Sequence, residues 1–156
     1  MTRKNPVALP EDDYVLLIGQ LAYTVSYLEW IILGDLPGLA QHVPASLTVS
    51  ALAGKSTGQI AGALAKAAPN IGDDAVRAYV ECAGRLLGEA ANVRNDVLHA
   101  RPATSPDHRQ RLYRWRPATG QKRHSAFFID TAWLERAIDQ LSEAVSALSA
   151  SRVRGR

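Results

Sequence analysis

The stretch between Pro10 and Pro37 constrains the fold of this chain more than any other. Three acids follow Pro10, where carboxylates favour the positive end of a helix dipole, and Pro37-Gly38 ends the pattern. A helix that is apolar on most sides needs cover on several of them. We therefore expect a first helix to about Leu36 that packs in a bundle and contributes to an interface between subunits. Its apolar residues wrap well beyond one face: Val15, Leu16, Leu17, Ile18, Leu21, Val25, Leu28, Trp30, Ile31, Ile32 and Leu33.

This stretch is also apolar enough to raise the question of a membrane span. One of its residues, Glu29, is an acid well inside the stretch, and a centred carboxylate costs roughly 3 kcal/mol in a bilayer. The first six residues lack the apolar core of a signal peptide. The single cysteine, Cys82, cannot form an internal disulfide, and we interpret it as a small buried hydrophobe. We expect a cytoplasmic protein that does not enter a membrane.

Three more helices are indicated further along the chain. Ser56 and Gln59 have the spacing of a capping box, which predicts a second helix that stops at Pro69-Asn70. A third helix begins near Asp73 and keeps a 3.6-residue apolar period to about His99. The last helix begins after Asp130 or Thr131. Residues 38–55 show no clear pattern.

The pattern changes between the third and last helices. Residues 112–115 and 126–129 are rich in aromatic and β-branched side chains, and Pro117, Thr119 and Gly120 between them favour a turn. We expect a β-hairpin within residues 110–129.

The predicted fold class is therefore mainly α, a four-helix up-down bundle with a small β-hairpin inserted before the last helix. The 156 residues, 47% of them hydrophobic and 21% charged, suit one domain with a sizeable core. We interpret residues 1–156 as that single domain and residues 151–156 as a basic tail.

The segment Arg94-Asn95-Asp96-Val97-Leu98-His99 carries the strongest indication of chemistry. Arginine offers a planar fork of donors that fits phosphate, and histidine moves protons near neutral pH. Asn95 and His99 are four residues apart and share a helix face, while the long side chain of Arg94 can reach that face. These residue types at the end of one helix point to chemistry on a phosphodiester.

Arg94, the polar Asn95 and His99 resemble the Rx4-6H motif of the HEPN superfamily, and the order of predicted helices is similar too. The resemblance implies a four-helix bundle of HEPN type whose arginine and histidine line a cleft between two protomers and cleave RNA without a metal. It implies that Arg94 holds the phosphate, that His99 transfers a proton or positions the 2′-hydroxyl, and that Asn95 orients the histidine or the phosphate. The superfamily also contains non-catalytic members.

A structural explanation of the motif is open beside the catalytic one. The dipole alone favours a histidine at a helix C-terminus. Asp96 could pair with Arg94 or with Arg101, which would make the segment a solvated helix end. A buried, paired Arg94 would favour an interaction module rather than an enzyme.

A second cluster is basic and has no acid from residue 108 to residue 129. Basic groups attract phosphates, and aromatic rings stack on unpaired bases. The alternative is a solvated edge hairpin whose aromatic residues pack on the helices. We predict nucleic-acid binding through Arg111, Arg114, Arg116, Lys122 and Arg123.

Two other kinds of site are not supported by the sequence. Gly54-Lys55-Ser56 lacks the earlier glycine of a phosphate loop, because position 49 is a valine. The four histidines do not have the spacing of a metal site, so we predict no metal and no cofactor.

Together these observations predict a metal-independent endoribonuclease that acts on RNA as a homodimer. The resemblance implies a role as a toxin or phage-defence effector, with an antitoxin protein as a possible partner. The alternatives are a non-catalytic interaction or regulatory module of the same fold, or a bundle that binds nucleotides or nucleic acid.

Overall fold

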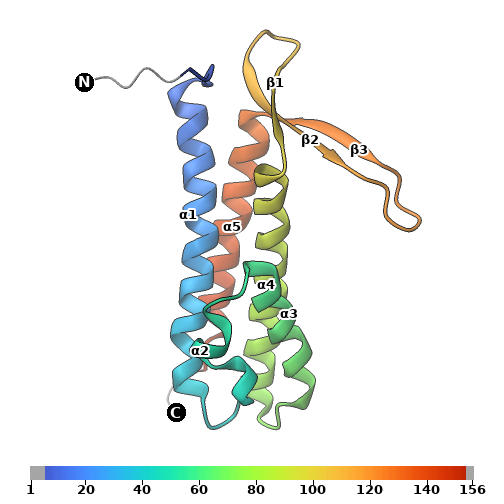
Figure 1. The fold of residues 1–156 in the computed structure, drawn as a ribbon. Coiled ribbons are helices and arrows are strands. Elements are labelled where there is room, and N and C mark those ends of the chain that lie inside the picture. The colour runs from blue at the N-terminus through green and yellow to red at the C-terminus, as the bar shows by residue number, and fades with distance from the viewer. Residues whose placement is uncertain (1–5, 154–156) are drawn as a thin grey trace.

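Three long helices run side by side through the molecule (Figure 1). In the computed structural model, which describes residues 6–153, they are α1 (Asp12–Asp35), α4 (Asp74–Leu98) and α5 (Thr131–Ser151). The shorter α3 (Thr57–Ala67) packs against α4. The four predicted helices are thus confirmed, and the protein is mainly helical.

The segment without a clear sequence pattern forms short turns of helix. It contains 3-10 turns at Leu36–Leu39 and Ala45–Leu47 and a one-turn helix, α2 (Val49–Leu52). From the end of α1 this segment runs along the bundle in the direction opposite to α1 (Figure 1). As a result, α3 begins beside the later part of α1, where the hydroxyl of Thr57 lies 2.7 Å from Oε2 of Glu29.

The direction of α3 differs from the strict up-down order predicted from the sequence. Near its start, Gly58 faces Ala91, and near its end, Leu64 faces Gly84. α3 is therefore antiparallel to α4 and runs in the same direction as α1. The predicted up-down order is wrong here because residues 38–55 showed no pattern from which their path could be predicted, and residues 36–56 return along the bundle before α3 begins.

Gly84 allows α3 and α4 to approach closely. A Cβ atom at this position would lie 3.1 Å from the backbone nitrogen of Ala65 and 3.2 Å from Cβ of Leu64. Around this contact the four helices bury one continuous apolar core. Its fully covered side chains include Leu28, Ile32, Leu64, Val80, Leu87 and Leu148.

The helix starts follow the predicted capping residues. Ser56 and Gln59 form the reciprocal capping box, with the Ser56 hydroxyl accepting from the backbone N–H of Gln59. Asp73 accepts from two N–H groups in the first turn of α4. Asp130 accepts from the N–H of Trp133 at 2.7 Å, so α5 begins at the predicted place.

A small antiparallel sheet projects from the end of the bundle (Figure 1). The predicted hairpin is confirmed as β2 (Gln110–Arg116) and β3 (Ser125–Ile129). A third strand, β1 (Arg101–Thr104), pairs with the other edge of β2 and was not predicted. This strand contains Pro102, which an edge strand tolerates because one side of its backbone needs no partner.

Tyr14 fastens the sheet to α1. Its hydroxyl donates to the carbonyl of Ile129 at 2.6 Å and accepts from the N–H of Leu112 at 3.1 Å. The guanidinium of Arg111 lies over the Tyr14 ring at 4.5 Å and donates to Glu11 at 2.6 Å. The start of α1 therefore fixes the position of β2 and β3 relative to the bundle.

By length and composition, residues 12–39 could cross a membrane, with a mean hydropathy of 1.5. A long core helix of a soluble protein meets the same criterion. Part of this helix belongs to the core, because 28% of its most apolar window is buried. Ser151, the first residue of the predicted basic tail of residues 151–156, is the last residue of α5, and residues 154–156 lie outside the described residues.

Candidate functional site

The residues of the Rx4-6H-like motif occupy the last turn of α4. His99 is the C-cap residue, and its backbone N–H donates to the carbonyl of Asn95 at 3.0 Å. The helix ends here because Pro102 disfavours helical geometry at the residue before it. The His99 side chain is exposed, and within residues 6–153 its imidazole makes no hydrogen bond or ion pair. It is free to meet a partner from solvent.

Arg94 is half-buried and is held by two side chains. Its Nη1 donates to Oγ1 of Thr57 at 2.7 Å, and its Nη2 makes a longer contact of 3.4 Å with Oδ1 of Asn95. The buried Nε has no hydrogen-bond partner among the described residues. The guanidinium therefore keeps donor capacity beyond its contacts inside the molecule.

The Thr57 hydroxyl links Arg94 to an acid on a third helix. This buried hydroxyl accepts from Arg94 and donates to Oε2 of Glu29 on α1 at 2.7 Å. Neither Glu29 nor Thr57 was predicted as a site residue. A signal was present, because Glu29 is the only acid between residues 14 and 34 of an otherwise apolar helix.

Asp96 belongs to a different network. It is 5% exposed and accepts from Nε of Arg114 at 3.1 Å and from Nε of Arg116 at 2.9 Å, with a second contact from Arg116. Burial by itself raises the pKa of Asp96, but the hydrogen bonds from Arg116 and Arg114 outweigh it and leave the pKa below its usual range. The structural explanation of the motif predicted that Asp96 pairs with Arg94 or Arg101. Asp96 pairs with Arg114 and Arg116 instead.

Helix geometry separates these two networks. Arg94 and Asp96 are two residues apart, which places them roughly 200° apart around the helix axis. Arg94 consequently points toward α3, whereas Asp96 points toward β2. By the same rule His99 lies roughly 140° from Arg94 and roughly 60° from Asp96. One short segment thus directs Asp96 to the sheet and Arg94 to α3, and leaves the exposed His99 between these two directions.

The two faces of the sheet also differ. Arg114 and Arg116 point inward to Asp96, and Arg116 lies over the Phe127 ring at 5.2 Å. The alternate residues of β2 point outward, with Tyr113 37% and Trp115 55% exposed. Tyr113 and Trp115 therefore face solvent. Phe127, by contrast, packs against the core with its ring 6.2 Å from that of Trp133 on α5, so the alternative in which the aromatic residues pack on the helices holds for Phe127.

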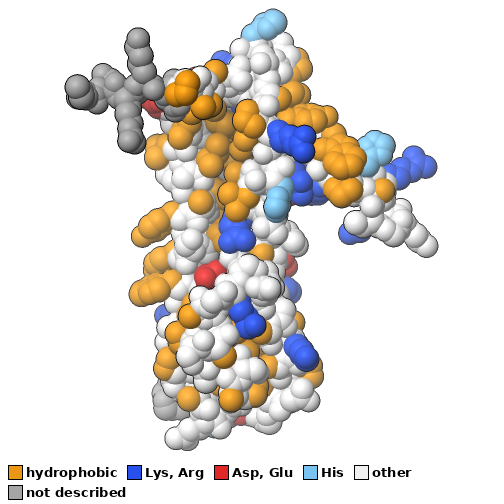
Figure 2. All heavy atoms as spheres, viewed as in Figure 1, with side chains coloured by type: hydrophobic (Ala, Val, Ile, Leu, Met, Phe, Trp, Pro, Cys, Tyr) orange, Lys and Arg blue, Asp and Glu red, His pale blue; other side chains and the backbone are white. Residues whose placement is uncertain are grey.

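Two further residues extend the outward face. Phe128 packs against Tyr113 with ring centroids 4.9 Å apart and the two rings inclined to each other. Arg101 of β1 is the cross-strand partner of Tyr113, so its side chain lies on the same face. We call Arg101, Tyr113, Trp115 and Phe128 the outer sheet face. In Figure 2 the projecting hairpin carries hydrophobic, basic and histidine side chains close together.

The five residues predicted to bind nucleic acid do not form one surface. Arg111 is buried and paired with Glu11, so a phosphate has no access to it. Arg114 and Arg116 pair with Asp96, although Arg116 keeps half of its side chain exposed. Lys122 and Arg123 are exposed at the turn between β2 and β3. Arg101 was not included in the prediction, although it lies on the outer face.

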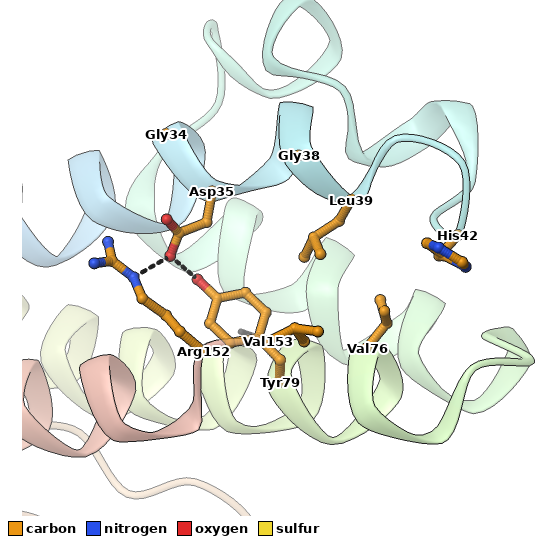
Figure 3. Close-up of a pocket in the computed structure, with 9 residues that line it drawn as sticks. All are labelled: Gly34, Asp35, Gly38, Leu39, His42, Val76, Tyr79, Arg152 and Val153. Carbon is orange, nitrogen blue, oxygen red and sulfur yellow. Dashed lines mark hydrogen bonds and ion pairs between the residues drawn. The ribbon is translucent and has the colours of Figure 1, made fainter. Parts of the chain in front are cut away.

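A cavity of about 260 Å³ lies at the opposite end of the bundle (Figure 3). Tyr79 donates to Oδ2 of Asp35 at 2.6 Å, and Nε of Arg152 donates to the same oxygen at 2.8 Å. Burial and the bond to Asp35 raise the pKa of Tyr79 well above its usual range, so its hydroxyl stays neutral. These groups satisfy one another, and they hold the end of α5 against α1.

No family model, curated protein or solved structure matches the chain. Among the described residues, no group of three or more histidine, cysteine, aspartate or glutamate side chains is placed to hold a metal ion.

Proposed function

We propose that this protein is a metal-independent endoribonuclease of HEPN type, built on a HEPN-like helical bundle. The observation that carries the proposal is the division at the end of α4. Asp96 is committed to Arg114 and Arg116, so it does not neutralise Arg94, and the His99 imidazole is open to solvent. A cation that fits phosphate and a free proton-transfer group therefore lie five residues apart at the end of one helix, a separation of roughly one and a half turns.

The proposed reaction uses the RNA itself as the nucleophile. The ribose 2′-oxygen attacks the adjacent phosphorus, its proton passes to a base, and the bond to the 5′-oxygen breaks as that oxygen gains a proton. His99 serves in this proton transfer. Arg94 binds the phosphate and stabilises its developing charge, exchanging its long contact with Asn95 for a phosphate oxygen. The products carry a 2′,3′-cyclic phosphate and a 5′-hydroxyl.

Glu29 and Thr57 act on this site through Arg94. The Thr57 hydroxyl accepts a hydrogen bond from Arg94 and donates one to Glu29, so it fixes the position of the Arg94 guanidinium. We assign Thr57 and Glu29 as positioning residues. Asn95 orients the guanidinium and the phosphate from the other side.

The outer sheet face supplies a binding surface for single-stranded RNA. Exposed aromatic rings stack on unpaired bases, and arginine contributes attraction to phosphate. Tyr113 and Trp115 offer the rings, and Arg101 lies beside them, two residues after His99. Lys122 and Arg123 add positive charge at the hairpin turn. RNA bound at Arg101 would therefore lie next to a residue that is only two positions from His99 in the sequence.

In the superfamily, the motif lines a cleft between two protomers. By this resemblance we propose that the protein forms a homodimer in which the C-terminal ends of the two α4 helices lie together. A role as a toxin or phage-defence effector, restrained by an antitoxin protein, follows from the same resemblance, and we propose that it acts in the cytoplasm because a single cysteine suits a reducing compartment.

The deciding experiment is cleavage of a fluorescent single-stranded RNA by the purified protein. Cleavage is expected to continue in EDTA and to leave 2′,3′-cyclic phosphate ends, while DNA of the same sequence stays intact because it lacks the 2′-hydroxyl. Cleavage that requires a divalent metal, or that cuts DNA equally, would overturn the mechanism.

A non-catalytic module is the second candidate, and the contacts of Arg94 favour it. Its Nη1 and Nη2 both have partners within the chain, which is what a structural arginine requires. This alternative predicts that wild-type protein does not cleave RNA and that Arg94→Ala lowers the free energy of unfolding. A cleaving wild type with a well-folded Arg94→Ala variant would exclude it.

A further inference from the structure

α1 carries a continuous apolar surface on the side facing away from the core. We call Leu16, Tyr23, Tyr27 and Trp30 the α1 stripe. All four are exposed, Tyr23 by 74% and Trp30 by 67%. In Figure 2, hydrophobic side chains protrude along the edge of the bundle that α1 forms. Side chains that lie three, four or seven residues apart share one helix face, so the α1 stripe is a single surface. Exposed apolar surfaces of this kind mark interaction sites.

The α1 stripe is uncharged and symmetric about its centre. Leu16 and Trp30 are each seven residues from Tyr23. Apart from Glu29, which is turned toward Thr57, no charged residue occurs between Asp13 and Asp35. We propose that the α1 stripes of two copies pack against each other in antiparallel orientation, with the two-fold axis at Tyr23. Tyr23 then meets Tyr23 of the second copy, and Leu16 meets its Trp30.

Large and small residues alternate in the way this arrangement requires. Pairing about Tyr23 places Tyr27 opposite Gly19 of the second copy. Gly19 has no other side chain near the position of its missing Cβ, so the space for a ring is open. Tyr23, Ser26, Tyr27 and Trp30 line a hollow of about 330 Å³, which in this register faces Leu16 and Gly19 of the second copy. The large ring of one copy therefore meets the smallest residue of the other.

Charges at the two ends of α1 favour antiparallel over parallel packing. Asp12 and Asp13 are exposed at its start. At its other end, Nε of Arg152 donates to Asp35 at 2.8 Å, and the Arg152 side chain is 44% exposed (Figure 3). Antiparallel packing brings the two acids toward the partner's arginine and pairs opposite helix dipoles. Parallel packing would place the acids of both copies together.

This contact goes beyond the proposed function and does not depend on it. Glu29, which reaches the Arg94 network, lies roughly 100° around α1 from Trp30. A second copy bound to the α1 stripe therefore leaves the end of α4 open. Loss of this contact and loss of RNA cleavage can be observed separately.

Cysteine cross-linking of the full chain tests both contact and orientation. In a Cys82→Ser background, Tyr23→Cys should form an intermolecular disulfide under mild oxidation, and the neighbouring Ala22→Cys should not. Leu16→Cys alone should not cross-link, but an equimolar mixture of Leu16→Cys and Trp30→Cys proteins should. Cross-linking of Leu16→Cys with itself would show parallel packing and overturn the proposal, as would absence of the Tyr23→Cys disulfide.

The mass of the assembly gives an independent readout. Sedimentation at micromolar concentration should show that Tyr23→Glu halves the mass of the wild-type assembly, with an unchanged circular dichroism spectrum because Tyr23 is exposed. The same proteins are tested for flotation with phosphatidylcholine–phosphatidylglycerol vesicles. An unchanged mass, or a monomeric wild type that floats with vesicles through the α1 stripe, would overturn the proposal.

Discussion

The two sides of the last turn of α4 differ in whether their polar groups are satisfied within the molecule. On one side, Asp96 is buried and accepts hydrogen bonds from two arginines of β2. Arg94, which points the opposite way, makes one short and one long contact, and His99 is exposed at the helix end. A six-residue segment thus contains an acid that holds the sheet to the bundle, together with an arginine and a histidine that can still donate hydrogen bonds to a ligand.

This difference assigns different roles to residues that the sequence motif alone does not distinguish. A buried carboxylate with two arginine partners is a structural element, because removing one partner leaves a charge without compensation. An exposed histidine at a helix end contributes little to the core, so its substitution leaves the fold intact. The comparison therefore predicts opposite results for variants on the two sides.

The largest effect is expected on the open side. His99→Ala and Arg94→Ala should each lower the rate of RNA cleavage by about 10²–10⁴-fold, because a proton-transfer group or a phosphate contact is lost. His99→Ala should unfold at the same denaturant concentration as wild type. Timed gel assays and urea titrations measure the two quantities. Undiminished cleavage by His99→Ala would break the comparison.

Asp96→Asn should affect stability instead. We expect it to lower the free energy of unfolding by about 3 kcal/mol, at the lower end for a broken buried pair because Arg116 is half-exposed. Where the variant is folded, cleavage should stay near the wild-type rate. The matched control is Asp139→Asn, whose carboxylate is exposed on α5. Equal stability of the two variants would show that Asp96 does not hold the sheet.

A smaller effect is expected at the outer sheet face. Trp115→Ala should weaken binding to single-stranded RNA by about 1–3 kcal/mol, because one stacked base is lost. Lys122→Gln should weaken binding less and reduce its salt dependence, because one phosphate contact is lost. Fluorescence anisotropy at several salt concentrations measures both. Charge reversal at Arg114 does not test this surface, since it would place an acid against Asp96.

The smallest effect is the pH dependence of the Asp96 network. Its pKa is lower in the folded protein than in the unfolded chain, so the unfolded state binds more protons in acid. The stabilisation is complete above the unfolded pKa near 4 and is lost as pH falls through the folded value. The free energy of unfolding should therefore decline more steeply below pH 4 in wild type than in Asp96→Asn. Parallel declines would refute the assignment.

Much of the fold could be predicted because its signals are local. The capping box of Ser56 and Gln59, the acceptor at Asp130 and the apolar period of α4 each act within a few residues. β1 was missed because four residues that include Pro102 give no alternating pattern. The predicted direction of α3 was wrong because residues 36–56 contain no regular helical pattern from which their path along the bundle could be predicted.

The candidate site was predicted only in part, for a related reason. Arg94, Asn95 and His99 lie within six residues, so helix geometry alone places them together. Glu29 and Thr57 join them only because α1, α3 and α4 meet at one level of the bundle. Arg111 was expected to bind RNA, but its position beside Tyr14 and Glu11 removes it from the surface.

The sequence by itself determined the helices, the hairpin and the presence of an arginine, an amide, an acid and a histidine at the end of α4. These follow from hydrogen bonding and apolar periodicity over short distances along the chain. The tertiary structure alone decided which partner each polar group has. Asp96 meets arginines 18 and 20 residues away because β2 crosses that side of α4, while Arg94 meets Thr57, 37 residues away, because α3 packs on the other side. Such contacts depend on how whole elements pack, which no local pattern contains.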